Sequence, residues 1–312
     1  MTAPWIARAL LLLVAATVCA TPGLAKELVN GQGILRRIDH GSVPPSHLFG
    51  TMHSADERVL DMPPGAQAAF AAADTLALEL LLARPEAKQR AAMVLGQSFL
   101  LTDGRSLDAL IGEQRFTAVS NALARIGLPP MVARIMKPWS AYLLVNAPPP
   151  RLDADGAPIP ALDARLELDA RAAGKKLVAL ESIEEQADLF ASKDEAAEIK
   201  LLGQLVDTGE ARGGLTRYLD ALFTLMLELY DAEDIGTIIE ITQPPMPPED
   251  QAALEMFMER AIWRRNARMV ERMDSLIAHG NAFIAIGAAH LPGDRGLVNL
   301  LAERGYTITR VQ

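Results

Sequence analysis

Two apolar runs near opposite ends of the chain each lead into a Gly-x-x-His tetrad, Gly50 to His53 and Gly287 to His290. The run at 283–286 has the length and β-branched content of a buried strand, and a glycine directly after it lets the backbone turn without a Cβ clash. Each histidine is therefore expected in a loop at the carboxyl end of a strand. Open α/β sheets bind ligands along that edge, so the two histidines can converge on one small site.

Strand-like runs are few and cluster toward the chain ends, whereas helix formers at helical spacing fill the tracts between them. The expected strands are 34–38, 47–49, 75–80, 177–180, 282–286 and 306–311, and the expected helical tracts are 84–101, 113–126, 130–145 with a break near Pro138, 163–173, 182–230 and 249–279. This pattern predicts an α/β (α+β) fold with a single core sheet built from both chain ends and large helical insertions. No internal boundary stands out, so we expect one domain over residues 26–312.

The first residues are typical of a secretory signal peptide, with Arg8 ahead of an apolar stretch that ends in small residues. We assign residues 1–25 to this signal, with cleavage after Ala25 or, alternatively, after Ala20. The single cysteine, Cys19, lies inside it. The mature chain therefore has no thiol, and any metal site must use histidine, carboxylate or amide groups.

The charge and hydropathy of the chain limit the classes of partner and the cellular location that we expect for it. The formal net charge is −9, and removal of Arg8 with the signal makes it −10. An acidic chain of this kind is a poor partner for nucleic acid or for an anionic membrane surface. After the signal no apolar run approaches the roughly 20 residues that span a bilayer. We expect a periplasmic or secreted protein with no membrane span in its mature part.

His53 and His290 are the first candidates for chemistry. Imidazole is a common transition-metal ligand and the natural base near neutral pH, and the matching tetrads favour a shared site. Three other histidines, His40, His47 and His279, lie at a turn or a helix end and are interpreted as bystanders. A lone histidine after a strand is often a hydrogen-bonded structural residue, so that interpretation stays open for both candidates.

Two glutamates also follow strand-like runs, in the matching segments 77–79 and 179–181, both Ala-Leu-Glu. A carboxylate at the end of a buried strand needs a partner, and a histidine or a metal ion would serve. Glu181 has a second interpretation, because it directly precedes a helix whose N-terminus favours negative charge. Glu79 is the stronger candidate of the two.

The long helix predicted at 249–279 carries an apolar stripe in which Arg265 falls between Ile262 and Met269, with Asn266 at its edge. An inward arginine needs a carboxylate or an anionic ligand. It would hold Glu79 or Glu181 in place, polarise a substrate carbonyl, or form a buried structural ion pair. The chain has no Gly-x-Ser-x-Gly elbow, phosphate-binding loop or dinucleotide fingerprint, which weakens a serine-hydrolase or nucleotide-binding interpretation.

Taken in order, these segments resemble the TraB/GumN family, which is related to the Tiki proteases. The resemblance rests on 48–53, the strand ending at Glu79, 180–186, Arg265 with Asn266, and 287–293. It implies a fold distantly similar to erythromycin-esterase-like proteins and a divalent-metal-dependent peptidase site. Asp163 also resembles a family position, without a clear role. One departure is that Glu79 is followed by three leucines where the family has a pattern such as Glu-Leu-Asp.

The resemblance and the residues together predict a metal-dependent hydrolase, most plausibly a peptidase. We expect His53, Glu79 and His290 to bind a divalent ion, manganese, cobalt or zinc, with Glu181 as a fourth ligand or the general base. Arg265 and Asn266 would stabilise the developing oxyanion of a peptide or small-molecule substrate. Two alternatives are a metal-free, esterase-like hydrolase with histidine as general base, and a non-catalytic periplasmic protein that binds a peptide or signal molecule.

Overall fold

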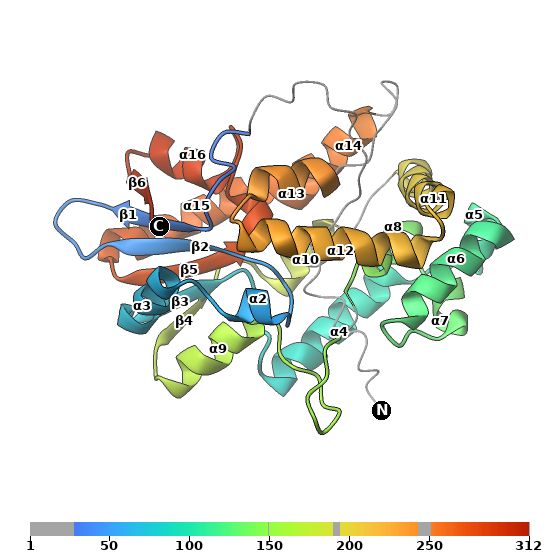
Figure 1. Cartoon of the computed structure of the whole chain (residues 1–312), viewed down its shortest axis with the longest axis horizontal. Coiled ribbons are helices and arrows are strands. Elements are labelled where there is room, and N and C mark those ends of the chain that lie inside the picture. Colours follow the sequence, from blue (N-terminus) through green and yellow to red (C-terminus); the bar gives the residue numbers. More distant parts are fainter. Residues whose placement is uncertain (1–27, 149, 190–193, 243–250, 312) are drawn as a thin grey trace.

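A computed structural model describes residues 28–148, 150–189, 194–242 and 251–311 of the chain. One six-stranded mixed sheet lies toward one end of the molecule (Figure 1), in the order β4-β3-β5-β2-β1-β6. The strands are β1 (Leu35–Asp39), β2 (Ser46–Thr51), β3 (Thr75–Leu78), β4 (Lys176–Ala179), β5 (Ala282–Gly287) and β6 (Thr307–Arg310). All six strands were predicted from the sequence, and the α/β fold with one sheet built from both chain ends is confirmed.

Helices fill the sequence between the strands. They are α2 (Glu57–Leu60), α3 (Pro64–Ala72), α4 (Pro85–Phe99), α5 (Leu107–Ile111), α6 (Glu113–Ala124), α7 (Pro130–Arg134), α8 (Pro138–Val145), α9 (Leu162–Ala172), α10 (Ile183–Leu189), α11 (Glu195–Ala211), α12 (Leu215–Asp231), α13 (Ile235–Thr242), α14 (Gln251–Met258), a π-helical segment η2 (Glu259–Trp263), α15 (Arg264–His279), a 3-10 turn η3 (Ala288–His290) and α16 (Leu297–Glu303). The break expected near Pro138 separates α7 from α8, because proline favours the first turn of a helix.

Strand direction decides which residues share an edge. β2 runs parallel to β5, β5 to β3, and β3 to β4, whereas β1 is antiparallel to both β2 and β6. The carboxyl ends of β4, β3, β5 and β2 therefore lie side by side. The interior strands are apolar on both faces, and β5 is buried over Ala282–Ile286, as expected for a parallel strand between two helical layers.

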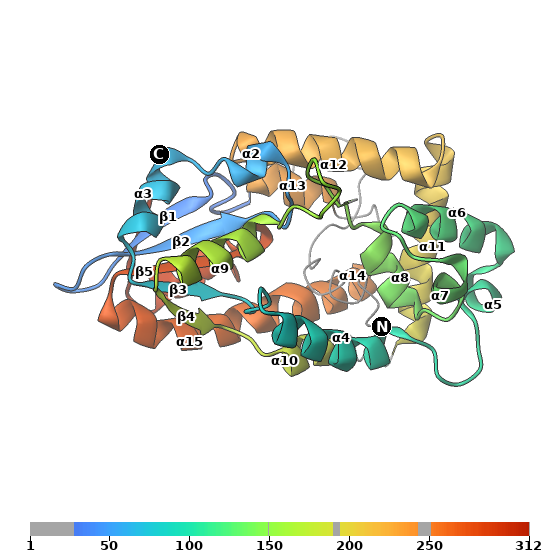
Figure 2. The same cartoon turned by 90° about the horizontal axis from the view of Figure 1, so that it is seen from below.

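Each face of the sheet has its own apolar core. Met269, Val270 and Met273 of α15 pack with α16 on one face. The other face packs against α3, α9, α12 and α13. Figure 2 shows α15 and the pair α3 and α9 on opposite sides of the sheet.

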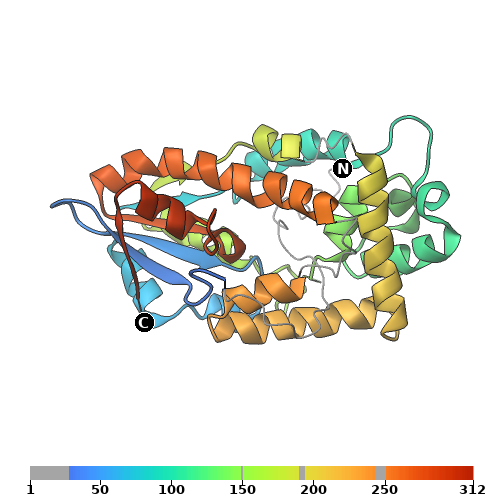
Figure 3. The ribbon, with the colours of Figure 1, turned by 90° about the horizontal axis from the view of Figure 1, so that it is seen from above.

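A third core belongs to the helical insertions. It is formed mainly by α4, α6, α8, α11 and the start of α12, with Phe99, Val119 and Leu202 fully buried. In Figure 3 the orange α15 and the gold α12 run along opposite sides of the molecule, and both extend from the sheet toward this helical part. The insertion is thus a packed unit joined to the sheet by long helices.

The predicted signal peptide, residues 1–25, lies outside the described residues. In the described part of the chain, none of the helices has both the length and the apolar character that a membrane span requires.

Candidate functional site

Four neighbouring strands bring the sequence-predicted residues to one edge of the sheet. Glu181 follows β4, Glu79 follows β3, His290 follows β5 and His53 follows β2, which is also the spatial order of the strands. The two tetrads begin side by side, because Gly50 pairs with Ile286 and Thr51 with Gly287 in the β2–β5 register. A Cβ at Gly50 would lie 3.1 Å from the Cα of Ala288, so glycine permits this close approach.

The guanidinium of Arg265 is the centre of this edge. Its side chain has no exposed surface. Nε lies 3.0 Å from both carboxylate oxygens of Glu181, and Nη2 donates to Glu181 Oε2 at 2.6 Å and to Glu79 Oε2. Burial opposes the charge, but the two carboxylates outweigh it and raise the pKa of Arg265. The arginine expected to point inward therefore does so, as a permanent cation between two glutamates.

A π-helical turn, Glu259–Trp263, directly precedes α15, in which Arg265 is the second residue. Such turns occur mostly as single-turn insertions in α-helices and often at functional sites. In the first turn of α15 Arg265 and Asn266 are both buried, and Arg265 Nη1 donates to the carbonyl of Ala261 at 3.0 Å. The long helix predicted from the sequence is thus interrupted where its two polar residues enter the core.

His290 is fully buried, and both of its ring nitrogens have partners within the protein. The amide nitrogen of Asn266 donates to the carbonyls of His290 and Arg295, so Asn266 Oδ1 is the acceptor for Nδ1–H of His290 at 2.6 Å. Nε2 then carries the lone pair and accepts from Nη1 of Arg265 at 2.9 Å. Burial, and next the charge of Arg265, hold the pKa of His290 well below its usual range. The imidazole is therefore neutral and fixed in one tautomer.

The two glutamates differ in their access to solvent. Glu181 has no exposed side-chain surface and accepts a further hydrogen bond from Gln186 at 3.2 Å. The Glu79 side chain is 22% exposed. Its Oε1 accepts from the backbone N–H of Gly287 at 2.9 Å and lies 4.0 Å from Nε2 of His290. Glu79 is therefore the carboxylate through which this buried network reaches solvent.

His53 is held by a different carboxylate, Asp163, in the first turn of α9. The Nδ1 of His53 lies 2.9 Å from Asp163 Oδ2, and the hydroxyl of Thr51 donates to Asp163 Oδ1 at 2.7 Å. Burial opposes ionisation of Asp163, but the hydrogen bonds from His53 and Thr51 outweigh it and lower its pKa. The His53 side chain is 21% exposed, and no described residue forms a hydrogen bond to its Nε2. His53 therefore has its Nδ1 bonded to a carboxylate and its Nε2 free of hydrogen bonds to described residues.

Comparison with known proteins identifies the family of this chain. The family model described as TraB/PrgY/gumN family matches residues 34–310. The chain belongs to this family. The resemblance seen in the sequence is thereby confirmed over nearly all of the described chain.

Curated relatives of this TraB/PrgY/gumN protein include several named metalloproteases. Metalloprotease TIKI1 of Danio rerio is 25% identical over 85% of this chain and 60% of its own length. Metalloprotease TIKI homologs of Amphimedon queenslandica and Nematostella vectensis are 23% and 24% identical, over 86% of this chain and 60% and 65% of their own lengths. The chain thus spans about 60% of the length of the relatives it matches. No solved structure matches it.

In the described part of this TraB/PrgY/gumN chain, the side chains of His53, Glu79 and His290 are not gathered around one point, as the expected metal centre requires. No group of three or more His, Cys, Asp or Glu side chains in the described ranges is arranged to hold a metal ion. The physical reason is that Arg265 occupies the place between Glu79, Glu181 and His290, and that it and Asn266 use both nitrogens of His290. The cation that faces Glu79 and Glu181 is thus the guanidinium of Arg265.

Two partnerships of the site were not expected. Asp163 was noted only as a family-like position, and its contact with His53 joins residues 110 positions apart. Tyr230 of α12 is the second, since its hydroxyl donates to the carbonyl of Gly50 at 2.8 Å and ties the first tetrad to the helical layer. The position of Asp163 at the start of a helix was the available signal, but the sequence did not indicate which strand end that helix would meet.

Proposed function

We propose that this chain is a hydrolase that cleaves peptide bonds in the periplasm or outside the cell, at the sheet edge where β2, β3, β4 and β5 end. Family membership and the name metalloprotease in the relatives support this class of reaction. The observation that carries the proposal is that the polar side chains at this edge differ in their exposure to solvent. Arg265, Asn266, His290 and Glu181 are buried, whereas His53 and Glu79 are partly exposed.

His53 is the general base in this proposal. Nδ1–H donates to the ionised Asp163, which leaves Nε2 free to take a proton from a water molecule attacking the peptide carbonyl. Asp163 fixes the tautomer and stabilises the imidazolium once Nε2 is protonated, and Thr51 holds the other carboxylate oxygen. The same imidazolium can then return its proton to the leaving amine.

Glu79 is the second group that would meet the substrate. Arg265 and the N–H of Gly287 hold its carboxylate from two sides, so the remaining lone pairs point in fixed directions. An ionised carboxylate placed in this way can orient the attacking water or accept the N–H of a bound peptide. The acidic net charge of the chain makes peptides or small molecules more suitable substrates than nucleic acid.

Arg265, Asn266, His290 and Glu181 are assigned positioning roles. The sequence suggested that Arg265 and Asn266 stabilise an oxyanion and that Glu181 is a ligand or base. With no exposed surface, these side chains act through Glu79 and the loop that follows β5. Because Glu181 and Glu79 share one guanidinium, loss of either changes the position of the other.

A divalent ion is implied by the names of the relatives, and the sequence predicts manganese, cobalt or zinc. His53 Nε2 and the Glu79 carboxylate keep free lone pairs, but His290 Nε2 does not while Arg265 is in place. The predicted three-residue set therefore does not fit such an ion, and no step is assigned to it here.

Cleavage of a peptide library, followed by mass spectrometry, tests the proposal with wild type, His53→Ala and the matched control His279→Ala, an exposed histidine at the end of α15. We expect the wild type and the control to cleave the same peptides and His53→Ala to lose about 10²- to 10⁴-fold in rate. Equal cleavage by all three proteins would overturn the role of His53. Tight peptide binding without turnover would instead identify a binding protein.

The same assay, repeated with a chelator and accompanied by elemental analysis, separates the metal-dependent and metal-free forms of the proposal. A stoichiometric ion whose removal abolishes cleavage would establish metal dependence. Cleavage that survives complete removal of metal would assign the reaction to His53 and Asp163 alone.

A further inference from the structure

A separate cavity lies at the β1–β6 end of the sheet. It has a volume of about 400 Å³ and is lined by residues 28–32, Arg36 of β1, Ile308 and Arg310 of β6, and Val298 of α16. β1 is antiparallel to β2, with Leu35 opposite Phe49, so the start of β1 faces the same edge as the end of β2. The cavity thus opens beside, and apart from, the strands that carry His53 and Glu79.

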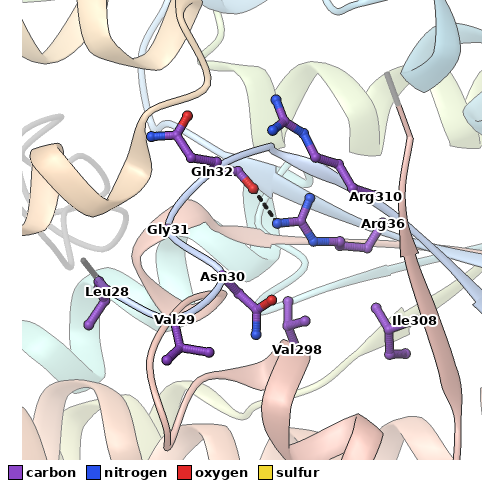
Figure 4. Close-up of a pocket in the computed structure, with 9 residues that line it drawn as sticks. All are labelled: Leu28, Val29, Asn30, Gly31, Gln32, Arg36, Val298, Ile308 and Arg310. Atoms are coloured by element: carbon purple, nitrogen blue, oxygen red, sulfur yellow. Dashed lines mark hydrogen bonds between the residues drawn. The ribbon is translucent and has the colours of Figure 1, made fainter. Parts of the chain in front are cut away.

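Two arginines meet in this cavity. Arg36 and Arg310 are directly opposite each other in the β1–β6 register, an arrangement of like charges that destabilises a sheet unless something compensates it. Figure 4 shows both guanidiniums on one side of the cavity, beside Gln32. Gly33, with a φ of 90°, makes room for them, because a Cβ at that position would collide with the guanidinium of Arg36 and with Nε of Arg310.

The charges around these arginines are not balanced. Arg36 is only 4% exposed, and its guanidinium donates to the carbonyls of Gln32 and Leu35, with no carboxylate bonded to it among the described residues. Nη2 of Arg310 donates a hydrogen bond to Oε2 of Glu233 at 3.0 Å. Burial and then the charge of Arg310 lower the pKa of Arg36, and Glu233 offsets this only in part. Two cations therefore share one carboxylate.

Backbone hydrogen bonds hold the walls of the cavity in place without a bound ligand. The segment before β1 is held by three backbone hydrogen bonds, from Gly33 to the carbonyl of Glu233 at 2.8 Å, from Gly236 to that of Gly31 at 2.8 Å, and from Gly293 to that of Val29 at 2.7 Å. Backbone contacts of this kind need no ligand to form, so little ordering is required when the cavity is filled.

We propose that this cavity binds a small organic anion, whose carboxylate or phosphate group lies between Arg36 and Arg310 and whose apolar part contacts Leu28, Val298 and Ile308. A planar guanidinium matches either oxyanion in a bidentate manner, and a second guanidinium adds charge-assisted hydrogen bonds. Such an anion supplies the negative charge that the two arginines lack. The proposal does not depend on the hydrolytic function of the chain.

Ligand-observed NMR with the purified protein tests the site, using butyrate, its neutral isostere butyramide, and inorganic phosphate as probes at constant ionic strength. The variants are Arg36→Gln, Arg310→Gln and the matched control Arg37→Gln. Arg37 is the next residue of β1, is exposed, and pairs with Asp39 outside the cavity. Thermal denaturation of each variant identifies any that fails to fold, and Arg310→Gln, at an exposed position, serves if Arg36→Gln does not.

We expect butyrate, phosphate or both to bind the wild type and Arg37→Gln equally, and the affinity to fall by about tenfold or more in Arg36→Gln and Arg310→Gln. Binding of butyrate without butyramide assigns an organic carboxylate, and binding of phosphate alone assigns a phosphate group. Absence of binding by both anions, or an equal loss in all three variants, would overturn the proposal.

Discussion

Nη1 of Arg265 and Nε2 of His290 lie 2.9 Å apart in the fully buried interior beneath the sheet edge. The ring nitrogen that a metal ion would need is therefore the acceptor of a hydrogen bond from a cationic side chain. Asn266 holds the opposite nitrogen. His290 is, in this arrangement, a support for the site, whereas His53 has the free nitrogen.

The first prediction concerns His290→Gln. Glutamine cannot meet Arg265 and Asn266 with the geometry of the ring, so at least one buried polar group loses its partner. We expect the free energy of unfolding to fall by about 1–3 kcal/mol in urea denaturation. If a metal ion copurifies with the protein, the metal-to-protein ratio should be unchanged. A lower ratio with full stability would contradict this role.

The second prediction concerns the buried charge pair. Glu181→Gln removes the buried carboxylate that meets Arg265 at both Nε and Nη2, and leaves the partly exposed Glu79 as the carboxylate bonded to this cation. We expect a loss of about 3–5 kcal/mol of stability. The matched control is Glu184→Gln, because Glu184 makes an exposed pair with Arg90 that is worth about 0–1 kcal/mol. Equal effects of the two substitutions on urea denaturation would show that Arg265 does not depend on Glu181.

The third prediction concerns Asp163→Asn. Asparagine keeps the shape of the side chain but cannot stabilise a protonated His53, so kcat should fall by about 10²-fold or more, toward about 10⁴-fold. KM should change little, because Asp163 contacts His53 and Thr51 and acts through the base. Steady-state kinetics on a peptide found in the library assay measure both constants. A rise in KM with kcat preserved would assign Asp163 to substrate binding.

The fourth prediction is a pH dependence of stability. The pKa of His290 is lowered in the folded protein from its ordinary value of 6.5, so below about pH 6.5 the unfolded chain binds a proton that the folded chain does not. Protonation of the unfolded chain therefore costs no stability above about pH 6.5. Below that pH the free energy of unfolding decreases, with a slope of up to about 1.4 kcal/mol per pH unit. Urea denaturation between pH 7.5 and 5.5 should show this slope in the wild type and a flatter one in His290→Gln. Parallel slopes would contradict a buried, neutral His290.

Local patterns in the sequence were sufficient for the six strands, for most of the long helices and for the inward direction of Arg265, whereas α3, α13 and α16 were not predicted. The interior strands β3 and β5 are apolar runs, and the stripe from Ile262 to Met269 fixes the face on which Arg265 lies. These signals depend on spacing within one segment. The carboxyl-edge placement of His53, Glu79 and His290 followed from the same local reasoning.

Contacts between distant segments were not available from the sequence. The partner of His53 is Asp163 on α9, and the strand order decides that β5 lies between β2 and β3. The π-helical turn before Arg265 has no recognised sequence signal here. Hydrogen-bond directions were likewise not available from the sequence, which did not indicate that Arg265 and Asn266 use both ring nitrogens of His290.

Nitrogen-15 NMR of the imidazole rings tests the division between the two histidines most directly. The protein is labelled at histidine, and His53 and His290 are assigned with single His→Gln variants. We expect His290 to remain the neutral Nδ1–H tautomer from pH 7.5 to 5.5, with no change in its Nε2 resonance when zinc is added. A His290 ring protonated on Nε2 would show that this nitrogen does not accept from Arg265. An Nε2 resonance that shifts on zinc binding would show that this histidine is a metal ligand and that Arg265 does not hold it.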